Sequence, residues 1–138
     1  MRNPKTILLV DDDADLIQAL VPRCRRLGLD VKTAHNAMAA VKIMDQSLPD
    51  LVCLDVNMPT GNGLAICEAM ADDPETAKIP VIIMTAQHNP EAIQKCGDLC
   101  VYSINKSGEL WKRLEPVIYE LIDIEPSRKP DACQNKGQ

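Results

Sequence analysis

Aromatic side chains are scarce in this 138-residue chain, which has no phenylalanine, one tryptophan and two tyrosines. Proteins that bind single-stranded nucleic acid stack the bases on aromatic rings. Binding to nucleic acids in general, or to an anionic membrane, needs a basic surface, whereas this chain has a formal net charge of −5. We therefore expect neither nucleic acid nor a membrane among its partners, and we expect a core of aliphatic side chains.

Long hydrophobic runs are also missing from the sequence. No apolar stretch approaches the roughly 20 residues that a membrane-spanning helix needs. Residues 1–6 are polar and lead directly into a strand-like run, which is not how a signal peptide begins. These two observations predict a cytoplasmic protein.

The six cysteines form no recognisable metal or redox motif. No C-x-x-C occurs, and neither His35 nor His88 has a cysteine at the spacing of a zinc site. Buried thiols behave as small hydrophobic groups. We therefore expect structural thiols rather than disulfides or metal ligands.

Short strand-like runs alternate with helical patterns along the chain, which is typical of a parallel sheet covered by helices on both faces. The pattern stops near Glu125, so we expect one domain over residues 1–124 and a disordered tail over residues 125–138. The fold class is predicted to be α/β, three-layered and doubly wound, with five strands and five helices. Strands are predicted at about 5–10, 30–34, 50–55, 80–84 and 99–104, and the last three helices at about 63–72, 90–96 and 108–123.

The first two helices are predicted from their ends and their apolar faces. Asp13 and Asn36 are suitable N-cap residues for the first and second helix, because a short polar side chain can accept a free N–H of the first turn. Gly28 suits the C-terminal end of the first helix. On the second helix, the residues predicted to be buried are Ala37, Ala40, Val41 and Met44.

Four strand-like runs end on or near polar side chains. The first run ends at Val10 and is followed by three aspartates, and the third, fourth and fifth lead to Asp55, Thr85 and Lys106. Because the carboxyl ends of parallel strands border the ligand-binding crevice of such a sheet, we expect these side chains to converge. Each residue alone has an ordinary alternative role, such as a helix cap for Asp13, but packing does not explain the whole set.

The predicted cluster has the chemistry of a phosphoryl-transfer site. Two unit charges about 4 Å apart repel by roughly 4 kcal/mol at an effective dielectric near 20, so Asp11, Asp12 and Asp55 should take up protons or bind a cation. An oxygen-only site suits Mg²⁺. Asp55 is the candidate nucleophile, since aspartate can form an aspartyl phosphate. Thr85 and Lys106 would then hold two of the phosphoryl oxygens.

With these residues, the chain closely resembles the response-regulator receiver domain of two-component signalling. The match covers about residues 5–123 and implies a flavodoxin-like sheet with strand order 2-1-3-4-5. It is carried by Ile7 to Asp13, by Asp50 to Pro59 with Gly63 eight residues after Asp55, by Ile83 to Ala86 with Thr85 thirty residues beyond Asp55, and by Lys106 twenty-one residues beyond Thr85.

The resemblance implies a role for each matching residue. Asp55 would accept a phosphoryl group from the phosphohistidine of a histidine kinase or from a small donor such as acetyl phosphate. Asp12, Asp55 and the main-chain carbonyl of Asn57 would bind Mg²⁺, with Asp11 bound directly or through water. Thr85 and Lys106 would bind the phosphoryl group.

The resemblance also implies how the phosphoryl group is lost. Asn57 and Gln87 stand two residues after Asp55 and Thr85, where the family tunes autodephosphorylation. Uncharged residues at both positions predict hydrolysis at a moderate rate.

Three features depart from the family pattern. Ser107 follows Lys106 where receivers commonly carry proline. The usual switch aromatic lies three residues before the lysine, but Ser103 occupies that position and Tyr102 is one residue away. The segment from Thr85 to Gly97 is shorter than the family's fourth-helix region. We therefore expect an intact catalytic end and a specialised output face.

The resulting hypothesis is a stand-alone, phosphorylatable signalling switch, with no chemistry beyond self-phosphorylation and autodephosphorylation. A fragment of a longer protein would look the same. The expected partners are a histidine kinase or phosphotransfer protein and an unidentified downstream protein, and weak homodimerisation is left open. The alternatives are a phosphorylation-independent interaction module and an aspartate-nucleophile phosphatase. The phosphatase would want a second carboxylate where Asn57 stands.

Overall fold

The computed structural model describes residues 4–55, 63–85, 100–106 and 108–122, which form a five-stranded parallel sheet in the order β2-β1-β3-β4-β5. The predicted flavodoxin-like fold is therefore confirmed. The predicted helix at about 90–96 and the predicted tail at 125–138 lie outside the described residues. The strands are β1 (Thr6–Val10), β2 (Asp30–Ala34), β3 (Leu51–Asp55), β4 (Val81–Thr85) and β5 (Cys100–Asn105), and the described helices are α1 (Ala14–Arg26), α2 (Ala37–Gln46), α3 (Gly63–Asp72) and α5 (Leu110–Leu121).

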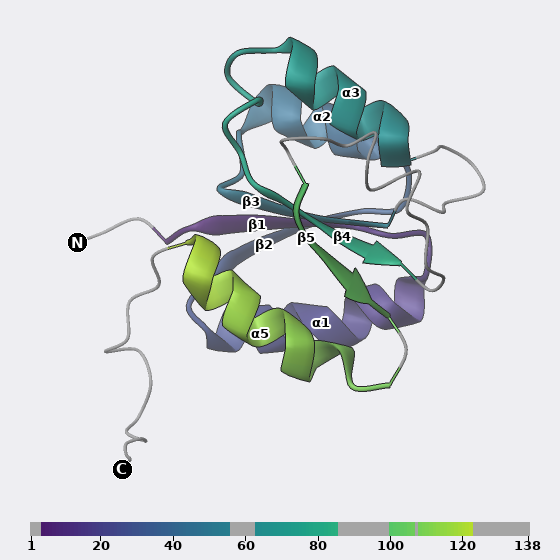
Figure 1. The fold of residues 1–138 in the computed structure, drawn as a ribbon, viewed down its shortest axis with the longest axis vertical. Helices are drawn as coiled ribbons and strands as arrows, with labels where there is room; N and C mark the ends of the chain where they lie inside the picture. Colours follow the sequence, from purple (N-terminus) through teal and green to yellow (C-terminus); the bar gives the residue numbers. More distant parts are fainter. Residues whose placement is uncertain (1–3, 56–62, 86–99, 107, 123–138) are drawn as a thin grey trace.

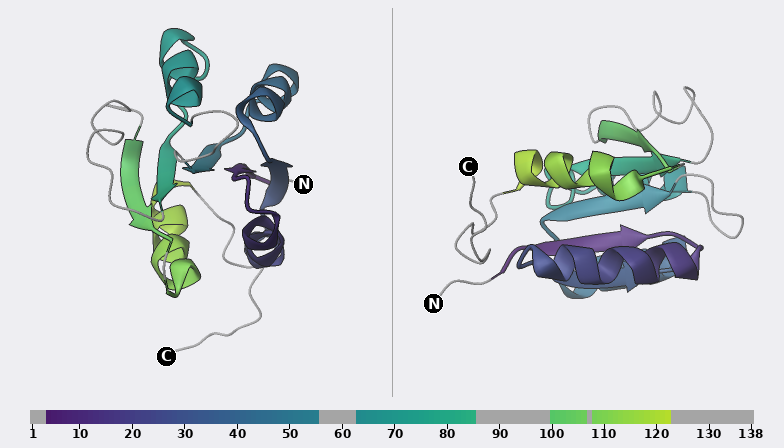
Figure 2. Two further views of the ribbon diagram at one scale, coloured as in Figure 1. Left: turned by 90° about the vertical axis from the view of Figure 1, so that its right-hand side faces the viewer. Right: turned by 90° about the horizontal axis from the view of Figure 1, so that it is seen from below.

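Helices cover both faces of the sheet, as Figures 1 and 2 show: α1 and α5 lie on one face, and α2 and α3 on the other. Side chains alternate between the faces along each strand. In β1, Ile7 and Leu9 belong to the core beneath α1 and α5, whereas Leu8 and Val10 belong to the core beneath α2 and α3. No described helix is long and apolar enough to cross a membrane.

The central strands are continuous apolar runs because both of their faces are covered. Every residue of β3 and β4 is buried, and so are the last four residues of β1. The edge strand β2 instead has exposed or half-buried residues at its first four positions. The last residues of β1, β3 and β4 therefore bring buried chain as far as the carboxyl edge of the sheet.

Both predicted N-caps are confirmed. The Asp13 carboxylate accepts a hydrogen bond from the Leu16 N–H at 3.1 Å, and the Asn36 side-chain oxygen accepts one from the Ala39 N–H at 2.8 Å. Gly28 follows the end of α1 with a φ of 90°, a backbone conformation that favours glycine. The two N-caps therefore fix where α1 and α2 begin, shortly after the ends of β1 and β2.

The predicted buried face of α2 is partly wrong. Ala40 and Met44 are buried and Ala37 is half-buried, as expected, but Val41 is 38% exposed. Ile43 packs against the core in its place. The inward face of α2 therefore runs through positions three, four and seven residues apart, and Val41 lies beside that stripe.

β5 contains an irregularity that determines where its aromatic side chain points. Ile82 pairs with Tyr102 although the preceding Val81 pairs with Cys100, so Val101 is left without a partner in the register. Tyr102 packs against the core beneath α1 and α5, and its hydroxyl donates a hydrogen bond to Glu120 of α5 at 2.5 Å. Tyr102 is therefore held toward α5 in this structure.

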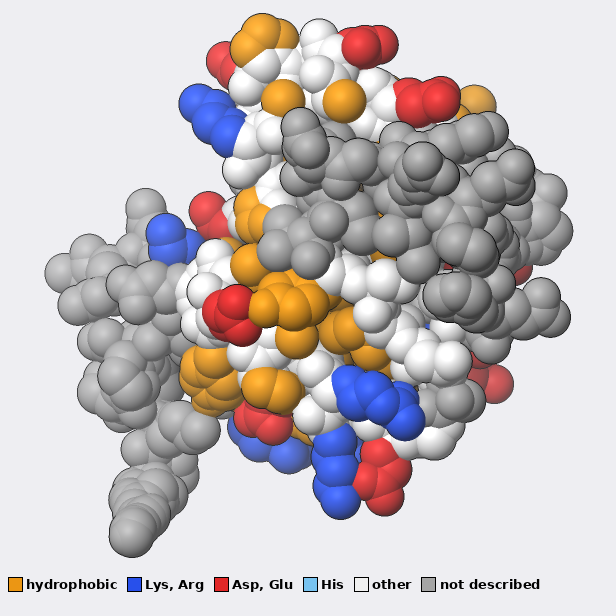
Figure 3. Space-filling model, viewed as in Figure 1, with side chains coloured by type: hydrophobic (Ala, Val, Ile, Leu, Met, Phe, Trp, Pro, Cys, Tyr) orange, Lys and Arg blue, Asp and Glu red, His pale blue; other side chains and the backbone are white. Residues whose placement is uncertain are grey.

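Apolar side chains gather at the surface over β5 and α5 (Figure 3). Tyr119 is 36% exposed, and the half-buried Trp111 and Leu121 pack against the core beneath α1 and α5. The guanidinium of Arg23 on α1 lies 5.9 Å from the centre of the Trp111 ring, a cation–π contact that joins α1 to α5.

Candidate functional site

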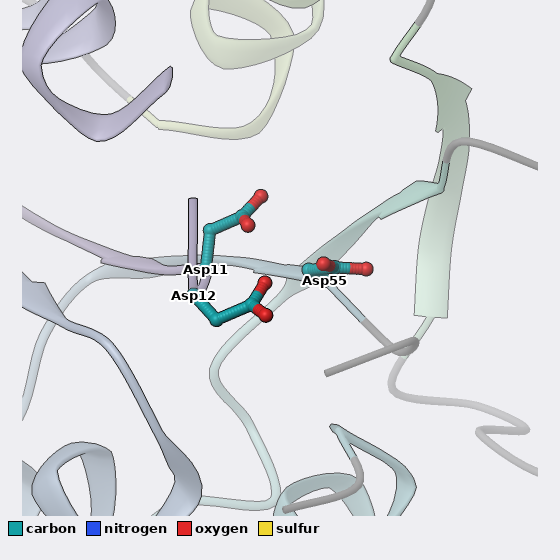
Figure 4. A group of neighbouring side chains, drawn as sticks. All are labelled: Asp11, Asp12 and Asp55. Carbon is teal, nitrogen blue, oxygen red and sulfur yellow. The ribbon is translucent and has the colours of Figure 1, made fainter. Parts of the chain in front are cut away.

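Three carboxylates meet at the carboxyl edge of the sheet (Figure 4). Asp11 and Asp12 directly follow β1, and Asp55 is the last residue of the neighbouring strand β3. One oxygen from each carboxylate can be chosen so that all three lie within 4.8 Å of one another. The convergence that the sequence predicted is therefore present for these three residues.

The burial of these carboxylates is unequal. Asp11 is 0% exposed and Asp55 is 3% exposed, whereas Asp12 is exposed to solvent. Buried carboxylates are uncommon unless a cation or several hydrogen bonds compensate their charge. Two of the three acidic groups in the cluster therefore need compensation from neighbouring groups.

Lys106 supplies a positive charge to the buried pair. Its Nζ lies 2.9 Å from Asp11 Oδ2 and 3.3 Å from Asp55 Oδ2, and its side chain is only 15% exposed. Burial by itself lowers the pKa of the Lys106 ammonium, but its contacts with Asp11 and Asp55 outweigh burial and raise the pKa above the ordinary value. Lys106 is therefore a cation that links the ends of β1 and β3 through ion pairs with Asp11 and Asp55.

The pKa of the Asp11 carboxyl is raised above that of a surface aspartate. Burial raises its pKa, and the negative charge of Asp55 adds to this rise, while Lys106 and the Asp13 N–H oppose it. Asp11 Oδ1 accepts the Asp13 N–H at 2.9 Å. Its buried Oδ2 makes the ion pair with Lys106 without a well-formed hydrogen bond among the described residues. Asp11 Oδ2 is therefore suited to bind a second cation in addition to Lys106.

Thr85 lies on the other side of Asp55. β4 pairs with β3 so that Asp55 is opposite Met84, which places Thr85 one residue further toward the carboxyl edge. Thr85 is 4% exposed, and its carbonyl accepts the Lys106 N–H at 2.8 Å. This backbone bond holds Lys106 next to the end of β4.

The donor set fits a hard divalent cation such as Mg²⁺. It consists of carboxylate oxygens, with no cysteine or histidine among the three clustered groups. Asp12 is exposed enough to leave room for water ligands, and Asp11 and Asp55 bring negative charge from inside the protein. Asn57 and Gln87, the two other residues named from the sequence, lie outside the described residues.

One neighbour of the cluster was missed by the sequence reasoning. His35 follows β2, and its Nδ1 lies 3.3 Å from the main-chain oxygen of Asp11. A signal was available, because β2 is the strand next to β1 in the implied order and its C-terminal end reaches the same edge. The histidine was considered only as a zinc ligand, and this search ignored the position of its strand.

Comparison with known proteins identifies the family. The sequence-family model of the response regulator receiver domain matches residues 7–107 of this chain. The chain belongs to the response regulator receiver domain family. Receiver domains are the phosphorylatable switches of two-component signalling, and the acidic cluster described above lies within the matched residues.

Named relatives agree with this assignment. The chain is 36% identical to the response regulator PleD of Caulobacter vibrioides over 80 residues, which are 58% of the chain and 18% of PleD. It is 28% identical to protein RcaC of Microchaete diplosiphon over 122 residues, 83% of the chain and 19% of RcaC. The receiver therefore spans about a fifth of the length of these relatives.

A solved receiver shares the three-dimensional fold. The signal receiver domain of a DNA-binding response regulator from Colwellia psychrerythraea superposes with a TM-score of 0.76 at 28% identity, covering 85% of this chain and 97% of that one. The sheet order and the helices on both faces are therefore those of a receiver.

Proposed function

We propose that this receiver accepts a phosphoryl group on Asp55, in a Mg²⁺-dependent reaction, from the phosphohistidine of a histidine kinase or phosphotransfer protein. One observation carries the proposal: a buried aspartate at the tip of a central strand is clustered with two more carboxylates and lies 3.3 Å from the ammonium of Lys106. A structural ion pair would need only one aspartate and one lysine. The additional acidic groups add repulsion unless a cation binds.

The position of Asp55 favours it as the nucleophile over Asp11 and Asp12. Its strand lies between β1, which carries the other two carboxylates, and β4, which carries Thr85. A phosphoryl group on Asp55 can therefore meet metal-binding groups on one side and hydrogen-bond donors on the other. Asp11 and Asp12 follow β1, which lies one strand further from β4 and Thr85 than β3 does.

In the transfer, an oxygen of Asp55 attacks phosphorus, the P–N bond to the donor histidine breaks, and the proton required by the leaving imidazole comes from solvent or the donor protein. Lys106 moves from its ion pair onto a phosphoryl oxygen, and the Thr85 hydroxyl donates to another. Bound by Asp11, Asp12 and Asp55 together with the main-chain carbonyl of Asn57, Mg²⁺ would neutralise the negative charge that accumulates there. Catalysis is then positioning and charge compensation, because the transferred group is already activated.

The product is an acyl phosphate that this receiver itself hydrolyses, with Asn57 and Gln87 proposed to set the rate. Substitution of Asn57 by aspartate and of Gln87 by alanine should each change the half-life of the phosphorylated protein. An unchanged half-life in both variants would remove this part of the proposal.

The signal is proposed to leave through contacts with a downstream protein. The apolar side chains over β5 and α5 supply a surface for such contacts, or for a weak homodimer. Position 103, where receivers usually carry the switch aromatic, holds a serine, and the neighbouring Tyr102 is hydrogen-bonded to Glu120. Rotation of an aromatic ring is therefore not part of the proposed relay.

The direct test incubates the protein with Mg²⁺ and acetyl phosphate and measures the intact mass. We expect the wild type and the exposed-carboxylate control Asp45→Asn to gain one phosphoryl group, and Asp55→Asn to gain none. No gain in the folded wild type would favour an interaction module. Repeated turnover of a phosphate ester would favour a phosphatase.

A further inference from the structure

A groove lies between α1 and the edge strand β2, and at one end it reaches His35, beside the acidic cluster. It has a volume of about 350 Å³. α1 contributes the apolar side chains of Ile17, Val21 and Pro22, and β2 contributes Val31 and Thr33. The nine lining residues extend along α1 as far as Ala14 and Arg25, about 16 Å at 1.5 Å per residue. The groove is therefore long and narrow, with a length that about five residues of extended chain would span.

The β2 side of this groove carries backbone groups that face away from the sheet. In β2, the Asp30 N–H donates to Lys5 and the Ala34 carbonyl accepts from Asp11, so residues 30, 32 and 34 point their backbone groups toward β1. Alternation along the strand turns the N–H and C=O groups of Val31 and Thr33 outward. The same two residues place their side chains in the groove. β2 thus offers both outward-facing backbone hydrogen-bonding groups and side chains that line the groove.

The two edges of the sheet differ in how well they could accept another strand. β5, at one edge, has the irregularity at Val101, and a bulge is a common protection against unwanted pairing. β2, at the other edge, pairs with β1 in unbroken register from Asp30 to Ala34. No described strand lies beyond β2. The regular edge is therefore the one beside the groove.

The charge of the groove indicates the chemistry of its occupant. Arg25 lines one end and His35 the other, and none of the lining residues is acidic. Arg25 belongs to the basic last turn of α1, so a negatively charged side chain of an extended segment would be attracted to this end of the groove, and a lysine at the same position would be repelled.

We propose that this groove binds an extended, acidic peptide segment of a partner protein, which adds a strand beside β2. Main-chain hydrogen bonds to Val31 and Thr33 provide affinity. Alternate side chains of the peptide enter the groove and provide specificity. An acidic side chain meets Arg25. The site is independent of phosphorylation, and its test needs neither Mg²⁺ nor a phosphoryl donor.

The test titrates the full chain with the blocked peptide Glu-Thr-Val-Thr-Val-Thr-Glu and follows backbone amide shifts by NMR. Its glutamates and valines lie on one face of an extended chain, and the sequence is symmetric, so either strand direction is served. We expect saturable shifts at Val31, Thr33 and the facing residues of α1. A peptide with lysine in place of glutamate, and one N-methylated along one edge, should each bind more weakly. Shifts confined to β5, or equal binding of all three peptides, would overturn the proposal.

Two pairs of variants test the groups involved. Arg25→Gln should raise the dissociation constant about two- to fivefold, as for an exposed ion pair, whereas Arg26→Gln in the same turn should not, because Arg26 does not line the groove. Thr33→Pro removes an outward N–H and should weaken binding more than Thr33→Val, which keeps it. If Thr33→Pro fails to fold, the N-methylated peptide still tests the strand pairing, because it removes the peptide N–H groups that would donate to the outward carbonyls of β2. A protein that self-associates through β2 and excludes the peptide contradicts the proposal.

Discussion

Replacing Lys106 with methionine should destabilise the protein, and the loss should depend on pH. The side chain keeps its length but loses the ammonium that lies 2.9 Å from Asp11 and 3.3 Å from Asp55. Asp11 is fully buried, so its charge has no water to replace the lysine. The variant therefore isolates the effect of an uncompensated carboxylate pair in the absence of Mg²⁺.

The magnitude follows from these distances. A pair of unit charges at 2.9 Å interacts by about 6 kcal/mol at an effective dielectric of 20. Part of this is offset because the ammonium no longer has to be desolvated, and removing one partner of a buried pair costs about 3–5 kcal/mol overall. We expect a loss of about 3 kcal/mol near neutral pH, a large share of the stability of a small domain.

The sign of the pH dependence can be worked out from Asp11. Its pKa in the folded protein is already raised above the ordinary 3.8, and removing Lys106 raises it further. A carboxyl group whose pKa is raised by folding does not lower the free energy of unfolding at pH values below its pKa in the unfolded chain. Its cost grows as the pH rises above 3.8 toward the folded pKa, and is constant above that. The deficit of Lys106→Met should therefore be larger at about pH 8 than at about pH 5.

Urea unfolding of wild type, Lys106→Met and Lys112→Met at these two pH values measures the deficit. Lys112 is a control because its side chain is 79% exposed and forms an ion pair with the surface residue Glu109. Mg²⁺ should recover more stability in Lys106→Met than in wild type, since it replaces the missing charge. A deficit below about 1 kcal/mol, or one that is equal at both pH values, would refute the electrostatic account.

Three further predictions concern other parts of the fold. Asp13→Ala should lower the free energy of unfolding by about 1 kcal/mol in urea, and Asp13→Ser should retain most of it, because serine can still cap α1. The hydrogen bond to Glu120 raises the pKa of Tyr102 above its ordinary value of 10.0, so Tyr102→Phe should remove a tyrosine transition above that pH in an ultraviolet pH titration. Burial raises the pKa of Cys24 to about 12 and that of Cys53 well above its ordinary value, so peptide mapping should find both thiols unmodified by iodoacetamide until urea is added.

Much of the fold could be predicted because its determinants are local. Asp13 and Asn36 cap helices through bonds to residues three positions away, which a sequence window contains. The buried runs at β3 and β4 are long enough to be recognised without knowing their neighbours. Their order in the sheet came from the family resemblance rather than from the runs themselves.

The errors arose where a position depends on distant elements. Val41 is apolar and adjoins the buried Ala40, but which side of α2 faces the sheet is set by packing against β1, β2 and α3. His35 was missed because its closeness to Asp11 depends on β2 lying next to β1. The irregularity at Val101 likewise appears only when β5 is placed against β4.

The candidate site shows the same division. The identities of Asp11, Asp12, Asp55 and Lys106 were evident from the ends of the apolar runs. Their ion pairs and unequal burial were not, since these depend on how β1, β3 and β5 are arranged. Asp12 is exposed while Asp11 is fully buried, although the two are adjacent in sequence.

The central claim, that Asp55 is the residue that carries the phosphoryl group, is tested most directly by locating the modification. After incubation with Mg²⁺ and acetyl phosphate, the acyl phosphate is reduced with borohydride and the protein is digested and mapped by tandem mass spectrometry. The account predicts that Asp55 alone among the three clustered carboxylates is converted to homoserine. Conversion at Asp11 or Asp12 with Asp55 unmodified would contradict it.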